Sequence, residues 1–254
     1  LFQDKIDNTT GSIVWANDNK TIFYTKKDEV TLRSYKVFKH ILGINSSLDE
    51  LVYEEKDETF SCYIDKSKSN KYIFINSYHT LSTEVRFIDA NKPDGEWKIL
   101  QDRERGLEYY VNHFQDEFFI RTNLKAKNFC LMKTSVFKTS KENWEVLIAH
   151  RDDVLLNELD IFKDFLVLNE RKNGLTKIRV INWRGNREHY IKFDDPTYFV
   201  SSNINPDFET DLFRFSYTSL TTPSSIYDYN LETKDRILLK QQDVMGGEFD
   251  SNNY

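Results

Sequence analysis

The sequence has few of the residues that shape tight loops or cross-link small proteins. Its 254 residues include 8 glycines, 4 prolines and 2 cysteines. Cys62 and Cys130 lie on separate strand-like runs without metal-site spacing, so we expect two buried free thiols in a reducing cytosol rather than a disulfide framework. Because glycine is scarce, turns must rely on Asn, Asp, Ser and Lys, as in Asn17–Lys20 and Asp65–Asn70.

Other absences exclude whole classes of function. No apolar run approaches the ~18 residues of a transmembrane helix. No basic stripe accompanies the net charge of −6, from 41 acidic and 35 basic residues, so we expect neither a membrane nor a nucleic-acid partner. The first residue is Leu1 rather than Met, which leaves a removed signal peptide open. A cytoplasmic location is expected, with a periplasmic one as the alternative.

The sequence also lacks the local pattern of a serine hydrolase site. No Gly-x-Ser-x-Gly elbow occurs, although a nucleophilic serine needs such a strained turn with backbone donors beside it. The five histidines are scattered over the chain, at positions 40, 79, 113, 150 and 189. We therefore expect no catalytic residue, no metal site and no cofactor in this chain.

A loose repeat near 47 residues is the main positive feature. Strand-like runs begin at Thr21, Lys71, Glu117, Phe165 and Leu212, with spacings of 50, 46, 48 and 47 positions. Aromatic residues, 15% of the chain, suit the half-buried surface of a sheet. A strand-rich repeat of this length is typical of propeller blades, so we predict an all-β propeller of four-stranded antiparallel blades.

The pattern divides the chain into about five blades. They span residues 11–55, 59–101, 108–148, 155–193 and 197–240. The segment Leu1–Thr10 is interpreted as the last strand and exit loop of a preceding repeat, and Gln241–Tyr254 as a connector that loses the pattern. We therefore expect a part of a longer protein.

Six motifs in order resemble one family. They are Val14–Asp18 followed by Phe23-Tyr24, Tyr35–Phe60, Arg121–Phe129, Asn169–Leu175, Phe193–Pro196 and Tyr217–Pro223. Together they resemble the propeller domain of the oligopeptidase B group in the prolyl oligopeptidase family of serine peptidases. Ile44 departs from the threonine that often follows the glycine in the second motif.

The resemblance implies a role outside catalysis. Family members join a seven-bladed propeller to an α/β-hydrolase domain that carries the catalytic Ser, Asp and His. It implies that the propeller covers that site and admits short or flexible peptides, and that the enzyme cleaves after Lys or Arg. The expected partners are the protein's own hydrolase domain and short basic peptides. With about five of seven blades present, the chain could also self-associate through exposed blade edges.

Acidic connectors between blades are the candidate site. One cluster comprises Glu54, Glu55, Asp57 and Glu58, and another comprises Asp194 and Asp195. They are interpreted as interdomain ion-pair partners that also steer basic peptides. The alternative is solvated loops, in which exposed ion pairs contribute ~0–1 kcal/mol each.

Two other functions stay open at this point. A freestanding propeller that binds a protein partner on its loop face is the main alternative to the peptidase lid. A carbohydrate-acting enzyme would need paired carboxylates near the axis, and the inner strands offer few acidic residues.

Overall fold

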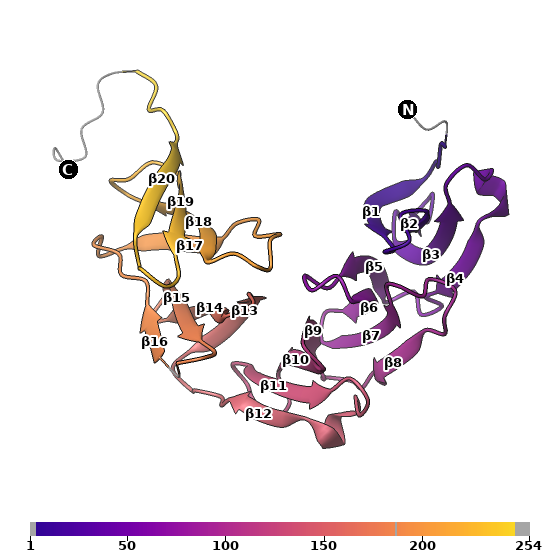
Figure 1. Cartoon of the computed structure of the whole chain (residues 1–254), viewed down its shortest axis with the longest axis horizontal. Coiled ribbons are helices and arrows are strands. Elements are labelled where there is room, and N and C mark those ends of the chain that lie inside the picture. Colours follow the sequence, from indigo (N-terminus) through magenta and orange to yellow (C-terminus); the bar gives the residue numbers. More distant parts are fainter. Residues whose placement is uncertain (1–3, 186, 247–254) are drawn as a thin grey trace. The chain divides into compact units, whose positions relative to one another are not determined.

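The computed structural model describes residues 4–185 and 187–246, which form five four-stranded antiparallel sheets (Figure 1). Within each sheet the strands are neighbours in the order in which they follow along the chain. Two short 3-10 helices, η1 (Ser46–Leu48) and η2 (Lys141–Asn143), are the helical segments of the described residues. The predicted all-β fold of four-stranded blades is therefore confirmed.

The first three sheets each comprise four strands. Sheet 1 contains β1 Thr9–Trp15, β2 Thr21–Lys27, β3 Ser34–Ile41 and β4 Glu50–Glu54. Sheet 2 contains β5 Ser61–Lys66, β6 Tyr72–His79, β7 Ser82–Asp89 and β8 Lys98–Gln101. Sheet 3 contains β9 Tyr109–Phe114, β10 Glu117–Thr122, β11 Cys130–Ser135 and β12 Glu145–Ile148.

The last two sheets follow the same plan. Sheet 4 contains β13 Leu155–Ile161, β14 Phe165–Lys172, β15 Leu175–Asn182 and β16 Arg187–Tyr190. Sheet 5 contains β17 Tyr198–Ser202, β18 Leu212–Ser219, β19 Ser225–Asn230 and β20 Arg236–Gln241. Every side chain of β20 is exposed, so self-association through a blade edge stays a prediction.

The first strand begins earlier than the sequence pattern indicates. Thr9 pairs with Lys26, and the register shifts between Thr9 and Ile13. The interpretation of Leu1–Thr10 as a preceding strand and loop is therefore wrong for Thr9 and Thr10. Their polar side chains and the irregular pairing hid the start of the strand. The expected connector Gln241–Tyr254 lies outside the described residues from position 247 onward.

Asparagine takes the place of glycine in several turns. Asn19 and Asn70 adopt φ values of 58° and 59° between the first two strands of sheets 1 and 2. Asparagine tolerates this left-handed region better than other residues with a side chain. In the first of these turns, the Asp18 carboxylate accepts hydrogen bonds from the backbone amides of Lys20 and Thr21, both at 2.9 Å. Few glycines are therefore needed.

The described residues fall into two compact units. The first comprises the residues up to Leu124 together with Leu131–Ile148, and the second comprises Lys125–Cys130 and the residues from Ala149 onward. In the first unit, Phe23 of sheet 1 meets the Trp97 ring edge-to-face, with ring centroids 5.5 Å apart. Each unit therefore contains a core between consecutive sheets.

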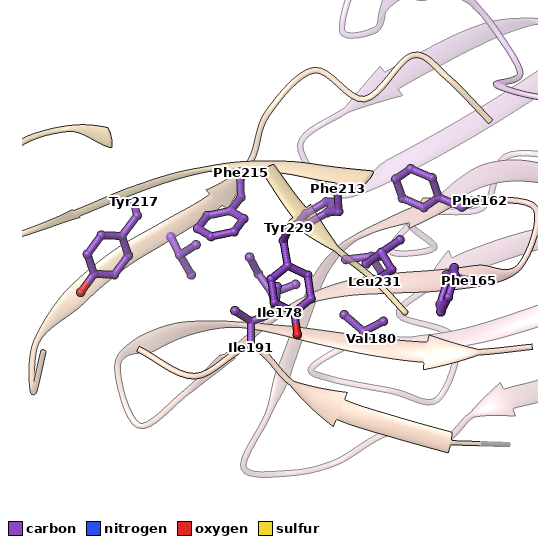
Figure 2. Packing of buried hydrophobic residues seen from close by; sticks show 12 residues of the cluster. Phe162, Phe165, Ile178, Val180, Ile191, Phe213, Phe215, Tyr217, Tyr229 and Leu231 are labelled. Atoms are coloured by element: carbon purple, nitrogen blue, oxygen red, sulfur yellow. The ribbon is translucent and has the colours of Figure 1, made fainter. Parts of the chain in front are cut away.

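The core of the second unit lies between sheets 4 and 5. Figure 2 shows the aromatic rings of Phe213, Phe215 and Tyr229 gathered with the aliphatic side chains of Ile178 and Val180. All five are buried, and Phe213 is 0% exposed. Alternate residues of the central strand β18 are buried in this core, as expected where one face of a sheet packs against a neighbouring sheet.

Replacing Phe213 by Ala tests this core. The substitution leaves a cavity that the two sheets cannot fill, so we expect the free energy of unfolding to fall by about 3–5 kcal/mol. Chemical denaturation measures the change. Phe137 is 85% exposed, and the matched control F137A should change stability by less than about 0.5 kcal/mol. Equal effects of the two variants would contradict the packing described here.

Candidate functional site

In sheets 1 and 2, the connectors between blades lie at one end of the strands. The connector that leaves β4 and the loop between β2 and β3 lie at this same end because neighbouring strands run in opposite directions. Arg33, in the β2–β3 loop, donates from Nη1 to the carbonyl oxygens of Asp57 at 3.1 Å and Phe60 at 2.7 Å. One guanidinium group therefore fixes the course of the connector from β4 to β5.

Glu55 is the buried centre of that connector. Glu55 is 3% exposed. Its Oε2 atom accepts hydrogen bonds from Arg103 Nη2 at 2.7 Å and from the Tyr53 hydroxyl at 2.6 Å. Oε1 accepts from the backbone amide of Asp57 at 3.0 Å. Arg103 belongs to the next connector, between β8 and β9, so this ion pair joins two successive connectors.

A second buried carboxylate completes the cluster. Glu84, at 5% exposure, accepts from the Arg103 backbone amide at 3.2 Å and from Arg103 Nη2 at 3.3 Å. It also pairs with Arg86. Two carboxylates, Glu55 and Glu84, thus face two guanidinium groups, and the charges balance.

Electrostatics keep both carboxylates ionised. Burial alone would raise the pKa of Glu55 and of Glu84, but hydrogen bonding and attraction to Arg103 outweigh burial and hold both pKa values below their usual range. The same contacts raise the pKa of Arg103. Because every charge has a close partner, the cluster binds loops to one another and leaves no free group to act on a substrate.

The other residues of the first acidic cluster are exposed. Glu54 pairs with Lys36 at 3.4 Å, and Asp57 accepts from the Thr59 amide and hydroxyl at 2.9 and 2.7 Å. Glu58 is also exposed. Asp57 and Glu58 are therefore oriented toward solvent, where another domain could reach them, while Glu55 is turned inward. Their contact with a further domain stays a prediction.

The second acidic cluster lies on the connector between β16 and β17. Asp194 is exposed and Asp195 is half-buried. The Asp195 carboxylate accepts from the hydroxyls of Tyr217, Thr221 and Thr222, the last two at 3.1 and 3.3 Å. The Tyr217 hydrogen bond is the largest of the contacts that lower the pKa of Asp195. Asp195 therefore anchors the β18–β19 loop to the connector.

Sequence reasoning missed a third anchor. Glu170, at 1% exposure, pairs with Arg151 and accepts from the Tyr190 hydroxyl at 2.6 Å. A signal for these anchors existed, because positions 55, 103 and 151 are spaced by 48 residues, close to one repeat. Equivalent positions in successive repeats occupy equivalent connectors, so charged residues there are candidates for contacts between connectors.

One histidine contacts a serine hydroxyl, and such a pair is also found in the active sites of enzymes with a serine nucleophile. His113 Nδ1 lies 2.7 Å from Ser69 Oγ, but Ser69 Oγ donates to Ser67 Oγ at 3.0 Å. Within the described part of the chain, His113 Nε2 has no hydrogen-bond partner, so no carboxylate orients the ring. Burial lowers the pKa of His113 to about 4. This pair lacks the orienting group of a triad and is a structural contact.

The described residues contain neither a metal-binding cluster nor a membrane-spanning helix. Residues 4–185 and 187–246 include no group of three or more His, Cys, Asp or Glu side chains that could hold a metal ion. Over the same residues, no helix has the length and apolar character needed to cross a bilayer. Cys62 and Cys130 are buried free cysteines.

The sheets and their linked connectors define the chain as a β-propeller domain. A family model described as "Prolyl oligopeptidase, N-terminal beta-propeller domain" matches residues 1–242, and the chain belongs to that family. The Moraxella lacunata protein named Protease 2 is 33% identical over 257 residues, covering 100% of this chain and 36% of that protein. The Pseudoxanthomonas mexicana protein named Dipeptidyl aminopeptidase BI is 40% identical over 255 residues, covering 100% of this chain and 35% of that protein.

Solved structures agree with this assignment. Oligopeptidase B from Leishmania major matches with a TM-score of 0.92 at 30% identity, over 99% of this chain and 36% of that one. Oligopeptidase B from Trypanosoma brucei matches with a TM-score of 0.90 at 29% identity, over 98% of this chain and 36% of that one. The chain thus spans about a third of the length of these relatives, and in them a catalytic domain is the propeller's partner.

Replacing Glu55 by Gln tests the buried cluster. The change removes the charge that pairs with Arg103, so we expect the free energy of unfolding to fall by about 2–3 kcal/mol. The matched control E54Q affects an exposed pair and should cost less than about 1 kcal/mol. Urea denaturation of both variants gives the comparison.

The same variants have a predicted pH dependence. The folded-state pKa of Glu55 lies below 4.5, its usual value, so its contribution is fully present above that value and is lost as pH falls through the folded-state pKa. The stability difference between wild type and E55Q should therefore shrink on acidification below about 4.5. A difference that grows on acidification would contradict the ion-pair assignment.

Proposed function

We propose that this chain is the non-catalytic propeller part of a serine-type peptidase, and that it acts as a lid and size filter over the catalytic site. The observation that carries the proposal is the set of ion pairs and hydrogen bonds that link connectors to one another or to neighbouring loops within each unit. A lid needs loops of fixed shape, and Glu55–Arg103 in the first unit and Asp195–Tyr217 in the second each supply such a fixed contact.

The chemistry of the described residues supports a role without bond cleavage by this chain. Glu55 and Glu84 are paired with arginine, and the Ser69–His113 contact has no orienting carboxylate. Two relatives carry names of peptidases, Protease 2 and Dipeptidyl aminopeptidase BI. We therefore assign the hydrolysis to the catalytic domain of the whole protein.

The substrate class is a further part of the proposal. Structural relatives are named oligopeptidase B, and the sequence motifs resemble that group. We propose that the whole enzyme is an endopeptidase that cleaves short peptides after Lys or Arg, with Asp57, Glu58 and Asp194 as exposed acidic groups on the connectors that attract basic peptides. We also propose a reducing, cytoplasmic location, which the buried free thiols support.

The size filter can be tested with one cleavage sequence in two contexts. A short peptide containing a Lys or Arg cleavage site is compared with the same sequence in a surface loop of a folded protein. The full-length wild-type enzyme should cleave the short peptide and exclude the folded protein. The E55A variant loosens two connectors, so its kcat/KM for the folded protein, relative to that for the peptide, should rise several-fold.

The control is E54A, which leaves the buried cluster intact and should retain the wild-type ratio. Product analysis by mass spectrometry also shows which bond is cleaved. Equal kcat/KM for both substrates in the wild type would contradict the size filter. Cleavage after neutral residues alone would contradict the proposed specificity without affecting the lid.

A further inference from the structure

Asp65 is an acidic residue that lies within a strand rather than on a connector, beside exposed aromatic side chains. It lies on β5, the first strand of sheet 2, and its side chain is exposed. Asn76 Nδ2 donates to Asp65 Oδ1 at 3.2 Å, and no Lys or Arg of the described residues forms an ion pair with it. On the connectors, by contrast, Glu55 contacts an arginine and Asp195 accepts hydrogen bonds from three hydroxyl groups.

The surroundings of Asp65 are aromatic. Tyr63 lies two residues earlier on β5, and therefore on the same face of the sheet. Its ring packs edge-on against Tyr78 of β6, with centroids 5.7 Å apart. Tyr63 and Tyr78 are 37% and 45% exposed, so solvent reaches both rings. Opposite Asp65 in the β5–β6 pairing is the buried Phe74.

These surroundings also affect the charge of Asp65. Desolvation by the protein around it raises the pKa of Asp65 to about 6, and the hydrogen bond from Asn76 offsets this only in part. A carboxylate that is partly desolvated and lacks a counterion is stabilised by an incoming cation. Exposed tyrosine rings attract the same kind of group through their faces.

The nearby guanidinium group of Arg121 already contacts an aromatic ring. The Arg121 guanidinium of β10 lies over the Tyr110 ring of β9, 4.0 Å from the centroid. Both residues influence the pKa of Tyr63, so they face this part of sheet 2, but neither is among the groups that affect Asp65.

We propose that Asp65, Asn76, Tyr63 and Tyr78 form a binding site for one organic cation of a peptide, either an ammonium or a guanidinium group. The carboxylate provides the charge, the Asn76 amide orients it, the Tyr63 ring flanks it on the same face, and the Tyr78 ring extends the aromatic surface by packing against Tyr63. The inference rests on the proposed function in one respect, namely that peptides reach the first strand of sheet 2. It adds a contact for them that is separate from the catalytic domain.

The test measures binding in the full-length protein, after its serine nucleophile has been blocked with an irreversible phosphonate. The probes are acetyl-Ala-Lys-Ala-amide, acetyl-Ala-Gln-Ala-amide and the unacetylated Ala-Gln-Ala-amide. The first carries a side-chain ammonium, the second carries no charge and the third carries an α-ammonium. Calorimetric titration gives the dissociation constant of each probe.

We expect a charged probe to bind the wild type roughly fivefold more tightly than the D65N variant, the effect of one partly exposed ion pair with aromatic contacts. The neutral probe should show no difference between the two proteins. D152N is the matched control, because Asp152 is fully exposed in a connector, and it should bind as the wild type does. The arm that responds, side-chain or α-ammonium, identifies the source of the cation.

The pH dependence gives a second readout. Binding of the charged probe to the wild type should weaken as pH falls through about 6, the pKa of Asp65, while binding to D65N should not change over that range. Equal affinity of wild type and D65N for both charged probes would overturn the site. Failure of the size filter would leave this result unaffected, because binding is measured with catalysis blocked.

Discussion

A sheet that is apolar on both faces is stable only between two other layers, and this constraint organises the whole chain. Phe165–Leu168 of β14 are buried, and β2 is buried over its first five residues. Such strands cannot be exposed on either side, so each sheet requires a neighbour. A repeat of about 47 residues supplies those neighbours one after another, with connectors of a few residues between them.

The connectors are where the repeats differ from one another. The sheets need only apolar side chains of suitable volume, and many sequences satisfy that requirement. The connector contacts need particular donors and acceptors: a carboxylate at position 55, a guanidinium at 103, and a hydroxyl at 217 for Asp195. Removing one member leaves a buried group without a partner, which costs more than the contact itself contributes. The course of the connectors is therefore specified by few residues.

The sheets could be predicted from the sequence because their signals are local and repeated. Alternating and continuous apolar runs mark the strands, and Asn19 and Asn70 mark turns that glycine usually occupies. The start of β1 could not be predicted, since Thr9 and Thr10 are polar and their pairing is irregular. Period alone places a strand only to within a few residues.

The acidic clusters could be found in the sequence, but their partners could not be assigned with the same ease. Glu55 and Arg103 are 48 residues apart, and Glu84 and Arg103 are 19 residues apart. Which carboxylate a guanidinium reaches depends on the register between β7 and its neighbours and on the course of two connectors. Charge pattern showed where ionic contacts gather. It did not show that Glu55 is turned inward while Asp57 and Glu58 face solvent.

Glu55 and Asp65 show how the surroundings of a carboxylate decide its role. Both are affected first by desolvation, which raises a carboxyl pKa. Arg103 reverses that effect at Glu55, so the charge is fully used within the protein. At Asp65 an amide is the partner, and the charge remains unbalanced beside two exposed tyrosine rings. The combination of a carboxylate without a counterion and exposed aromatic rings on one face of β5 and β6 is therefore the feature that supports a cationic ligand.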